Sequence, residues 1–311
     1  MEKPRYTLLI TCYNFEKFIR EAVEGGLAQT YEPLDIIISD DCSTDRSWDV
    51  IQETVAAYKG PHNIILNHNE KNLGFAANLN KSYGMARTDW VLNQSGDDIS
   101  LPTRVEEYAR LIESNPKLRC VGALYEEMDV NGNARPQQST QTKAVKQAQE
   151  ILPVVIGVVA AYHMDVFRIF GPLGEQVWNE DSVLALRAKL IGEVGVVEKK
   201  LVRYRFHDAN MGGGKSDDMK KHLAYLNNRR LPHLYQQMID LYVAEKMYPE
   251  RGAEFLRIRR YIEDFAYIKW FVSNWTLHPE WRGRLLRDLL FSVSHCRAFL
   301  VKCLRKLVGR V

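Results

Sequence analysis

The sequence lacks the features that mark a secreted or membrane-spanning chain. Its 311 residues include five cysteines, an odd number without the spacing of a zinc site, which suits a reducing compartment. The longest apolar run, 154–162, is too short to cross a bilayer. No small-residue cleavage site follows the apolar stretch at 7–13, so we expect no signal peptide and a cytoplasmic protein with reduced thiols.

A strong net charge is also absent. The formal charge of +3 gives no reason to expect nucleic acid as a partner. Hydrophobic residues make up 46% of the chain, which excludes a disordered protein and allows a sizeable core. The small total conceals an asymmetry, because residues 282–311 hold eight basic residues and one acidic residue. That segment carries +7, and the preceding 281 residues carry −4.

The first 125 residues alternate short apolar or β-branched runs with stretches of helical pattern. Short buried strands that alternate with helices predict an α/β fold with a doubly wound, mostly parallel sheet. Strands are expected at 8–10, 36–38, 64–66, 90–92 and 121–125, and helices at 15–28, 45–58, 75–86 and 103–114.

The rest of the chain has a different pattern. Residues 129–150 are polar and predict an exposed loop with a short helix, and nothing after Asp217 resembles a strand. We therefore predict an α/β domain at 1–215 and an all-helical C-terminal extension at 216–311. The other expected elements are strands at 154–161, 194–197 and 201–206, a helix at 180–190, and helical segments separated near Pro249 and Pro279.

Polar and acidic residues follow the expected strands of the first half. The carboxyl ends of parallel strands meet at one edge of a sheet, and ligands bind there. Several carboxylates in one cleft repel each other unless a cation or a donor-rich ligand lies between them. The segments are Thr11-Cys12-Tyr13-Asn14, Asp40-Asp41-Cys42-Ser43-Thr44-Asp45, Asn72-Leu73-Gly74 with Asn78, and Ser95-Gly96-Asp97-Asp98.

Each segment also has a structural interpretation. Asp45 is placed to cap a helix, and Asn72 with Gly74 is a common turn sequence. Asp97 and Asp98 could cap the helix after Pro102, but neither precedes it directly. Two adjacent acids after a buried strand favour metal binding.

Together with Asn179-Glu180-Asp181 and the segment Tyr204 to Asn210, these residues resemble the inverting glycosyltransferases of family 2, which have the GT-A fold. The resemblance covers about residues 5–215. It implies an enzyme that moves a sugar from a nucleotide diphosphate donor, UDP- or dTDP-linked, to a hydroxyl. The acceptor would be a glycan or a polyprenyl-diphosphate-linked oligosaccharide in bacterial surface polysaccharide synthesis of the O-antigen type.

The resemblance also implies a role for each matching residue near the nucleotide. Thr11 and Tyr13 would line the nucleoside pocket, and Asp41 would accept a hydrogen bond from the base. Asp97 would reach the ribose or the metal. The other nucleotide-binding positions implied are Asn14, Asn72, Gly74 and Asn78.

A divalent cation is implied as well. Asp98 and Asp97 would hold Mg²⁺ or Mn²⁺, which neutralises the diphosphate leaving group, and His207 would reach the metal or the diphosphate. The family often has Asp-x-Asp, whereas Ser95 stands at the first position here. Cys42 likewise stands where glycine is common, which could alter the turn.

Asp181 would be the general base for the acceptor hydroxyl, with Glu180 as the alternate base. An acidic residue at a helix start is also explained by the helix dipole. Trp178 would stack on a sugar face or lie in the core. Arg205 would bind phosphate or lie on a solvated strand face.

Two other interpretations come from the residues alone. Residues 209–216 fit a relaxed phosphate-loop pattern, but no acid-bearing strand follows them, so a flexible lid over the donor explains the glycines better. A P-loop NTPase is therefore disfavoured. A non-catalytic sugar-nucleotide-binding assembly partner stays open as an alternative.

The C-terminal segment has an apolar stripe at helical spacing with basic residues on the other face. It is either a helix packed on the domain or a helix that binds an anionic membrane surface. The second interpretation places the protein at the inner face of the cytoplasmic membrane. The stripe runs from Leu285 to Leu307, and the basic face includes Arg284, Arg287, Lys302, Arg305 and Lys306.

Overall fold

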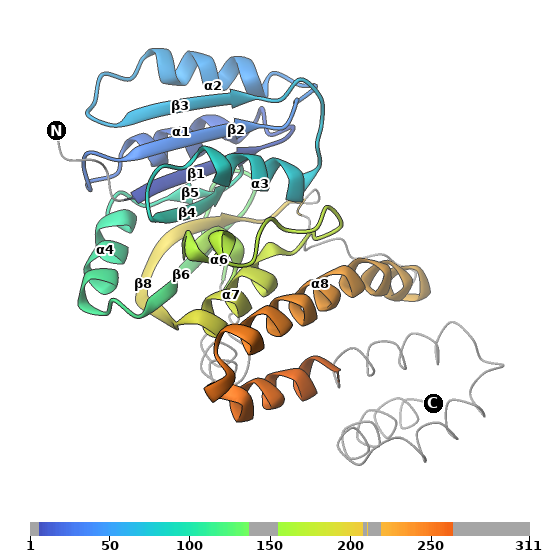
Figure 1. Cartoon of the computed structure of the whole chain (residues 1–311). Coiled ribbons are helices and arrows are strands. Elements are labelled where there is room, and N and C mark those ends of the chain that lie inside the picture. Colours follow the sequence, from blue (N-terminus) through green and yellow to red (C-terminus); the bar gives the residue numbers. More distant parts are fainter. Residues whose placement is uncertain (1–5, 137–154, 208–209, 211–218, 264–311) are drawn as a thin grey trace. The chain divides into compact units, whose positions relative to one another are not determined.

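The computed structural model describes residues 6–136, 155–207, 210 and 219–263 (Figure 1). The chain divides into two compact units, Met1–Gly214 and Lys215–Val311, which we describe separately. The loop helix expected within 129–150 and the basic segment at 282–311 lie outside the described residues, as does nearly all of the phosphate-loop-like segment.

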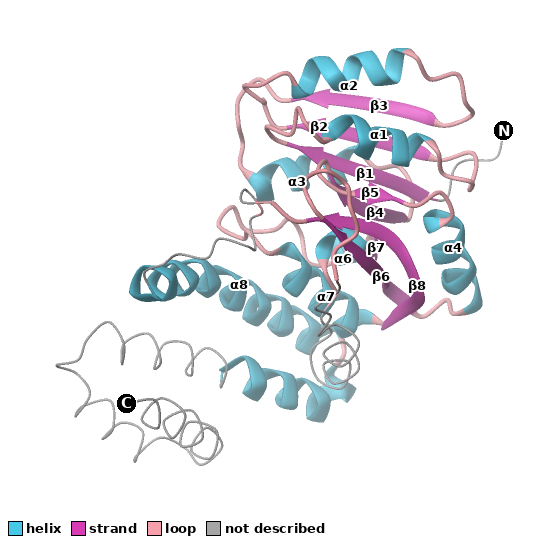
Figure 2. Ribbon diagram, turned by 180° about the vertical axis from the view of Figure 1, so that it is seen from behind, coloured by secondary structure: helices cyan, strands magenta, loops and turns pink. Residues whose placement is uncertain are grey.

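The first unit is built on an eight-stranded mixed sheet (Figure 2). Its strand order is β3-β2-β1-β4-β7-β6-β8-β5. The pairs β3/β2, β2/β1, β1/β4 and β6/β8 are parallel, whereas β7 and β5 are antiparallel to their neighbours. The strands are β1 Tyr6–Cys12, β2 Asp35–Asp40, β3 Asn63–His68, β4 Trp90–Ser95, β5 Ile99–Ser100, β6 Leu118–Met128, β7 Ala161–His163 and β8 Glu193–Arg205.

Helices cover both faces of this sheet and bury one hydrophobic core on each. Along β1, Leu8 and Ile10 belong to the core under α1, α2 and α4, while Leu9 belongs to the core under α3, α6 and α7. This alternation follows from the two-residue period of a strand. The helices are α1 Ile19–Leu27, α2 Ser47–Ala56, α3 Phe75–Met85, α4 Arg104–Ser114, α6 Asp165–Arg168 and α7 Glu180–Ile191.

The expected alternation of strands and helices in the first half is confirmed, but two expectations further along were wrong. The run 154–161 is not a strand, because a 3-10 turn at Gly157–Val159 precedes the short strand β7. A continuous apolar run shows no period, so its pattern cannot separate a strand from a buried turn. The strands expected at 194–197 and 201–206 are one strand, β8, paired along its length with β6.

The second unit is helical throughout its described residues. α8 spans Met219–Met247 with Pro232 inside it, a 3-10 turn follows at Pro249–Arg251, and residues 252–263 are helical. The expected break near Pro249 is therefore confirmed. None of the described helices is both long enough and apolar enough to span a bilayer.

Candidate active site

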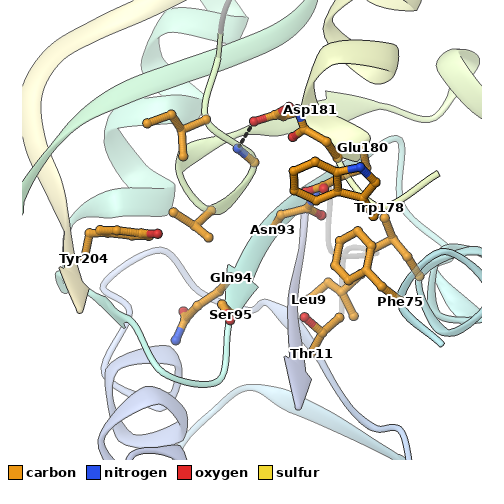
Figure 3. Close-up of a pocket in the computed structure, with 15 residues that line it drawn as sticks. Leu9, Thr11, Phe75, Asn93, Gln94, Ser95, Trp178, Glu180, Asp181 and Tyr204 are labelled. Carbon is orange, nitrogen blue, oxygen red and sulfur yellow. Dashed lines mark hydrogen bonds between the residues drawn. The ribbon is translucent and has the colours of Figure 1, made fainter. Parts of the chain in front are cut away.

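A pocket of about 250 Å³ lies beside the carboxyl-terminal halves of β1 and β4 (Figure 3). The sheet register sets Leu9 beside Asn93 and Thr11 beside Ser95, and these four residues line its floor. Figure 3 shows aromatic rings on both sides of the floor. The remaining lining residues are Phe75, Leu79, Gln94, Ile156, Gly157, Val158, Trp178, Asn179, Glu180, Asp181 and Tyr204.

Two acids at the start of α7 face this pocket. The backbone N–H of Gly157 donates to Asp181 Oδ2 at 3.3 Å (Figure 3). Burial raises the pKa of Asp181 to about 6, and burial together with the charge of Asp181 raises the pKa of Glu180 to about 8. Burial thus favours the protonated form of both carboxyls, and the neighbouring charge adds to this effect at Glu180.

Gly157 allows the two acids to lie against the pocket wall. A Cβ atom at position 157 would collide with the Glu180 Oε1 atom and would lie 3.6 Å from the Asp181 Cβ atom. A side chain there would displace the Glu180 carboxyl. The absence of a side chain is therefore part of the site.

A second group of acids lies just after β4. The Oδ1 atom of Asp98 accepts the backbone N–H of Arg205 at 2.8 Å, and the Oδ2 atom of Asp97 lies 2.9 Å from His207 Nε2. The other oxygen of each carboxyl is buried without a hydrogen-bond partner. Burial and the nearby charge of Asp97 raise the pKa of Asp98 well above its ordinary value.

These two orphaned oxygens have the chemistry that a divalent cation requires. Mg²⁺ and Mn²⁺ prefer hard oxygen ligands, and Mg²⁺ is commonly bound by one or two carboxylates together with water and substrate phosphate. Within the described ranges, no group of three or more His, Cys, Asp or Glu side chains could hold a metal ion. The two carboxyls are therefore fewer groups than a complete set of protein ligands for a metal ion.

Arg205 supports this acid pair from inside the domain. Its side chain is 1% exposed, its Nε donates to the backbone oxygen of Asp97 at 2.9 Å, and a terminal nitrogen donates to Glu21 at 2.6 Å. The guanidinium also lies over the Phe18 ring, which stacks on His207. Arg205 lies neither on a solvated face nor on the pocket wall, and its N–H groups bind the protein itself.

Asp41 connects the end of β2 to the start of α3. Its Oδ1 accepts from Asn69 Nδ2 and from the backbone N–H of Leu73, both at 2.8 Å, and its Oδ2 accepts from the N–H of Gly74 at 3.0 Å. Gly74 has φ +81°, a conformation that glycine adopts without strain, and α3 begins directly after it. A carboxylate oxygen has two lone pairs, so Oδ2 keeps one site for a ligand.

The asparagines of this region fix the same loop. Asn72 Oδ1 accepts from the N–H of Gly74 at 3.0 Å. Asn78 is buried, and its Oδ1 accepts from Ser39 Oγ and from Asn69 Nδ2. Asn72 therefore holds the backbone before α3, whereas Asn78 connects side chains at the ends of β2 and β3.

The loops after β1 and β2 are tied together. Asn14 donates its N–H to Ser43 Oγ at 2.9 Å and accepts from the N–H of Thr44 at 2.7 Å, while Tyr13 is 43% exposed. Cys42 has φ +59°, so the turn keeps a left-handed residue without glycine. The structural interpretation of Asp45 fits, since its Oδ1 accepts from the N–H of Ser47 at the start of α2.

The sequence-predicted residues thus fall into three places. Thr11, Trp178, Glu180 and Asp181 line the pocket. A second group, just after β4, consists of the acids Asp97 and Asp98 with their partners His207 and Arg205. The third group lies in or beside the loops at the strand ends and comprises Tyr13, Asn14, Asp41, Asn72, Gly74 and Asn78. Sequence reasoning missed Leu9 and Asn93 on the floor, although the two-residue period from Thr11 and Ser95 marks both.

A comparison with protein families identifies the family of this chain. The family model described as "Glycosyl transferase family 2" matches residues 7–170. The putative glycosyltransferase EpsE of Bacillus subtilis (strain 168) is 31% identical over 132 residues, 42% of this chain and 47% of EpsE. The uncharacterized glycosyltransferase alr2836 of Nostoc sp. is 23% identical over 219 residues, 66% of each. The chain thus spans about half to two thirds of these relatives.

Solved structures share the fold. TarS 1-349 of S. aureus, in complex with UDP-GlcNAc, superposes with a TM-score of 0.56 at 14% identity, covering 86% of this chain and 79% of TarS 1-349. The mannosyltransferase PcManGT from Pyrobaculum calidifontis, in complex with GDP-Man and Mn²⁺, gives 0.60 at 18% identity, covering 99% and 81%. The expected GT-A fold with C-terminal helices is confirmed.

Proposed function

Because this chain belongs to glycosyl transferase family 2, we propose that it is an enzyme that transfers a sugar from a nucleotide diphosphate donor to an acceptor hydroxyl, with inversion at the anomeric carbon. The observation that carries the proposal is the pair of acids, Glu180 and Asp181, that line the pocket beside β1 and β4. The orphaned carboxyl oxygens just after β4 support a diphosphate site nearby.

Asp181 is the proposed general base. The acceptor oxygen attacks the anomeric carbon from the face opposite the diphosphate and its proton passes to Asp181, while the bond from that carbon to the diphosphate oxygen breaks. The N–H of Gly157 donates to Asp181 Oδ2 and so fixes the orientation of the carboxylate that would take the proton. Glu180, which keeps its own proton near neutral pH, is a hydrogen-bond donor beside it.

Asp97 and Asp98 are the proposed ligands of Mg²⁺ or Mn²⁺. When bound, the cation would neutralise charge on the diphosphate leaving group. His207 lies against Asp97 through Nε2 and would orient that carboxyl, as hydrogen-bonded partners of metal ligands do. The backbone of Arg205 does the same for Asp98.

The proposed donor is a UDP- or dTDP-sugar. The remaining acceptor site on Asp41 Oδ2 suits the N–H edge of a uracil or thymine ring, and the exposed Tyr13 ring offers a face to the base or ribose. The proposed acceptor is a growing surface polysaccharide of the O-antigen type on a polyprenyl diphosphate. The protein would work at the inner face of the cytoplasmic membrane.

The replacement Asp181→Asn tests the proposed base. It keeps the shape of the side chain but removes the base, so transfer should fall by about 10²–10⁴-fold while nucleotide binding is retained. A panel of UDP-, dTDP- and GDP-sugars with Mg²⁺ or Mn²⁺ is screened by thermal shift, and release of the nucleotide diphosphate measures turnover.

The matched control is Asp89→Asn, a mostly exposed acid that precedes β4, at the end of this strand opposite to the pocket residues, and pairs with Arg168. It should keep full turnover. Full turnover in Asp181→Asn would contradict the assignment of the base. Nucleotide binding without turnover on any acceptor would instead favour a sugar-nucleotide-binding assembly partner.

A further inference from the structure

Asn93 on the pocket floor has a hydrogen-bond donor with nothing to bind. The side chain lines the pocket and is 6% exposed. Its Nδ2 atom has no partner. An unpaired buried amide costs free energy, so such a group in a pocket is usually satisfied by a ligand.

Tyr83 of α3 sets which end of the amide faces the pocket. The Tyr83 hydroxyl donates to Asn93 Oδ1 at 2.8 Å. Burial raises the pKa of Tyr83 well above its ordinary value, so the phenol keeps the proton that it donates. The oxygen of the amide is thus held against Tyr83, and Nδ2 remains for a ligand.

The surroundings of Asn93 suit a sugar ring. Leu9, Phe75 and Leu79 supply apolar surface, and Trp178 supplies an aromatic face, which carbohydrate C–H groups contact well. Because Nδ2 is only a donor, the group that it binds must be an acceptor, such as a hydroxyl or carbonyl oxygen on the ring.

The position of Asn93 on β4 indicates that this ring belongs to the donor and not to the acceptor. Asn93 and Ser95 are two residues apart on β4, share one face of the sheet and both line the pocket. The acids proposed to hold the diphosphate and its cation follow directly after this strand. The group attached to the diphosphate is therefore within reach of Asn93.

We propose that Asn93 is a specificity-determining residue whose Nδ2 donates a hydrogen bond to an oxygen of the transferred sugar, and that Tyr83 is its positioning residue. The proposal rests on the proposed function. On this proposal, the Asn93 side chain distinguishes donor sugars that are attached to the same nucleotide.

The experiment separates the sugar from the nucleotide. UDP-glucose, UDP-GlcNAc, dTDP-glucose and GDP-mannose are each titrated by calorimetry against their own nucleotide diphosphate, and the tightest pair is carried forward. The quantity compared is the ratio of the Kd of the nucleotide sugar to the Kd of the nucleotide. In Asn93→Asp, which keeps an acceptor for Tyr83 but replaces the donor, this ratio should rise about tenfold or more.

Two further variants grade the effect. Asn93→Leu removes donor and acceptor without adding charge and should raise the ratio similarly. Tyr83→Phe frees the amide to turn and should raise it less. All three should bind the nucleotide alone within about twofold of the wild type, since no part of the nucleotide is proposed to contact the amide.

The matched control is Asn80→Asp. Asn80 also lies on α3, but both ends of its amide bind the backbone of Leu173, so its replacement should lower stability and leave the ratio unchanged. An unchanged ratio in both Asn93 variants would overturn the proposal, as would equal weakening of nucleotide and nucleotide sugar. A wild-type protein that binds no nucleotide would instead refute the proposed function.

Discussion

At the scale of single residues, Glu180 and Asp181 are two adjacent acids that line one pocket and have raised pKa values. Burial raises both pKa values, and the charge of Asp181 raises that of Glu180 further. Such a pair titrates as a unit, with apparent values near 6 and 8. The pH dependence of activity follows from these values.

We predict that kcat/KM rises with pH through about 6, because the base must be ionised and its pKa lies there. Glu180→Gln mimics the protonated acid, so it should keep this rise and remove any change near pH 8. The measurement is a pH–rate profile of donor turnover for both proteins. Loss of the rise near pH 6 in Glu180→Gln would assign the base to Glu180.

The same shifts affect stability with a definite sign. An acid whose folded pKa lies above its unfolded value binds more protons in the native state. These two groups therefore make the protein less stable as pH rises from about 4 towards 8. Catalysis at neutral pH is thus obtained at some expense of folding free energy.

Sequence patterns indicate such residues unequally. Asp181 stands at a helix start in an ordered set of motifs, so its position in the pocket could be predicted. Asn93 begins the polar stretch 93–95 after the apolar run 90–92, and the two-residue period places it on the same strand face as Ser95, but the sequence gives no sign that its amide nitrogen lacks a partner. The orientation of the Asn93 amide depends on its hydrogen bond with Tyr83, and only the folded structure shows this contact.

At the scale of elements, β8 completes the region around the acid pair. Arg205 ends this strand and binds Asp97, Glu21 and the backbone oxygen of Val130. We predict that Arg205→Leu lowers the free energy of unfolding by about 2 kcal/mol, because the backbone oxygen of the buried residue Asp97 loses a hydrogen-bond donor that leucine cannot replace. Urea denaturation measures this change.

The surface pair of Arg20 and Glu53 provides the comparison. Both side chains are about half exposed, so Arg20→Ala should cost less than about 1 kcal/mol. If Arg205→Leu lowered the free energy of unfolding by no more than Arg20→Ala does, the buried arginine would contribute no more stability than an exposed ion pair. Its role in holding the acid group would then be disproved.

Elements with strong periodic patterns could be predicted, and short or interrupted elements could not. The β-branched runs that became β1, β2 and β3 have flanking turns and helices, which fix their type. β5 and β7 have two and three residues, too few for any period to show. β8 was divided in two because its exposed middle, Glu198 to Lys200, interrupts the apolar pattern.

At the scale of the whole molecule, charge is distributed unevenly along the chain. Residues 282–311 carry +7 in sequence and lie outside the described residues. We predict that the protein co-sediments with phosphatidylglycerol vesicles but not with phosphatidylcholine vesicles. The binding should weaken as salt is raised, since screening reduces attraction between basic residues and anionic lipid.

Charge reversal tests this membrane proposal without shortening the chain. The triple change Lys302→Glu, Arg305→Glu and Lys306→Glu should abolish sedimentation with anionic vesicles and leave donor binding intact. The matched control changes three exposed basic residues of the first unit to glutamate, namely Arg46, Arg110 and Arg168. This variant should still sediment with anionic vesicles. Equal binding by the two triple variants would refute the membrane proposal.

The bond between Arg205 and the acid pair also has a consequence for the order of events during synthesis. Asp98 and the backbone N–H that holds it are 107 residues apart in the chain. A nascent chain that ends at residue 170 contains β1 and β4, which form the pocket floor, and the acids Asp97 and Asp98. It contains neither the proposed base Asp181 nor Arg205. Translation proceeds from the N-terminus, so the chain acquires its proposed chemistry only when the final strand of the sheet has emerged from the ribosome.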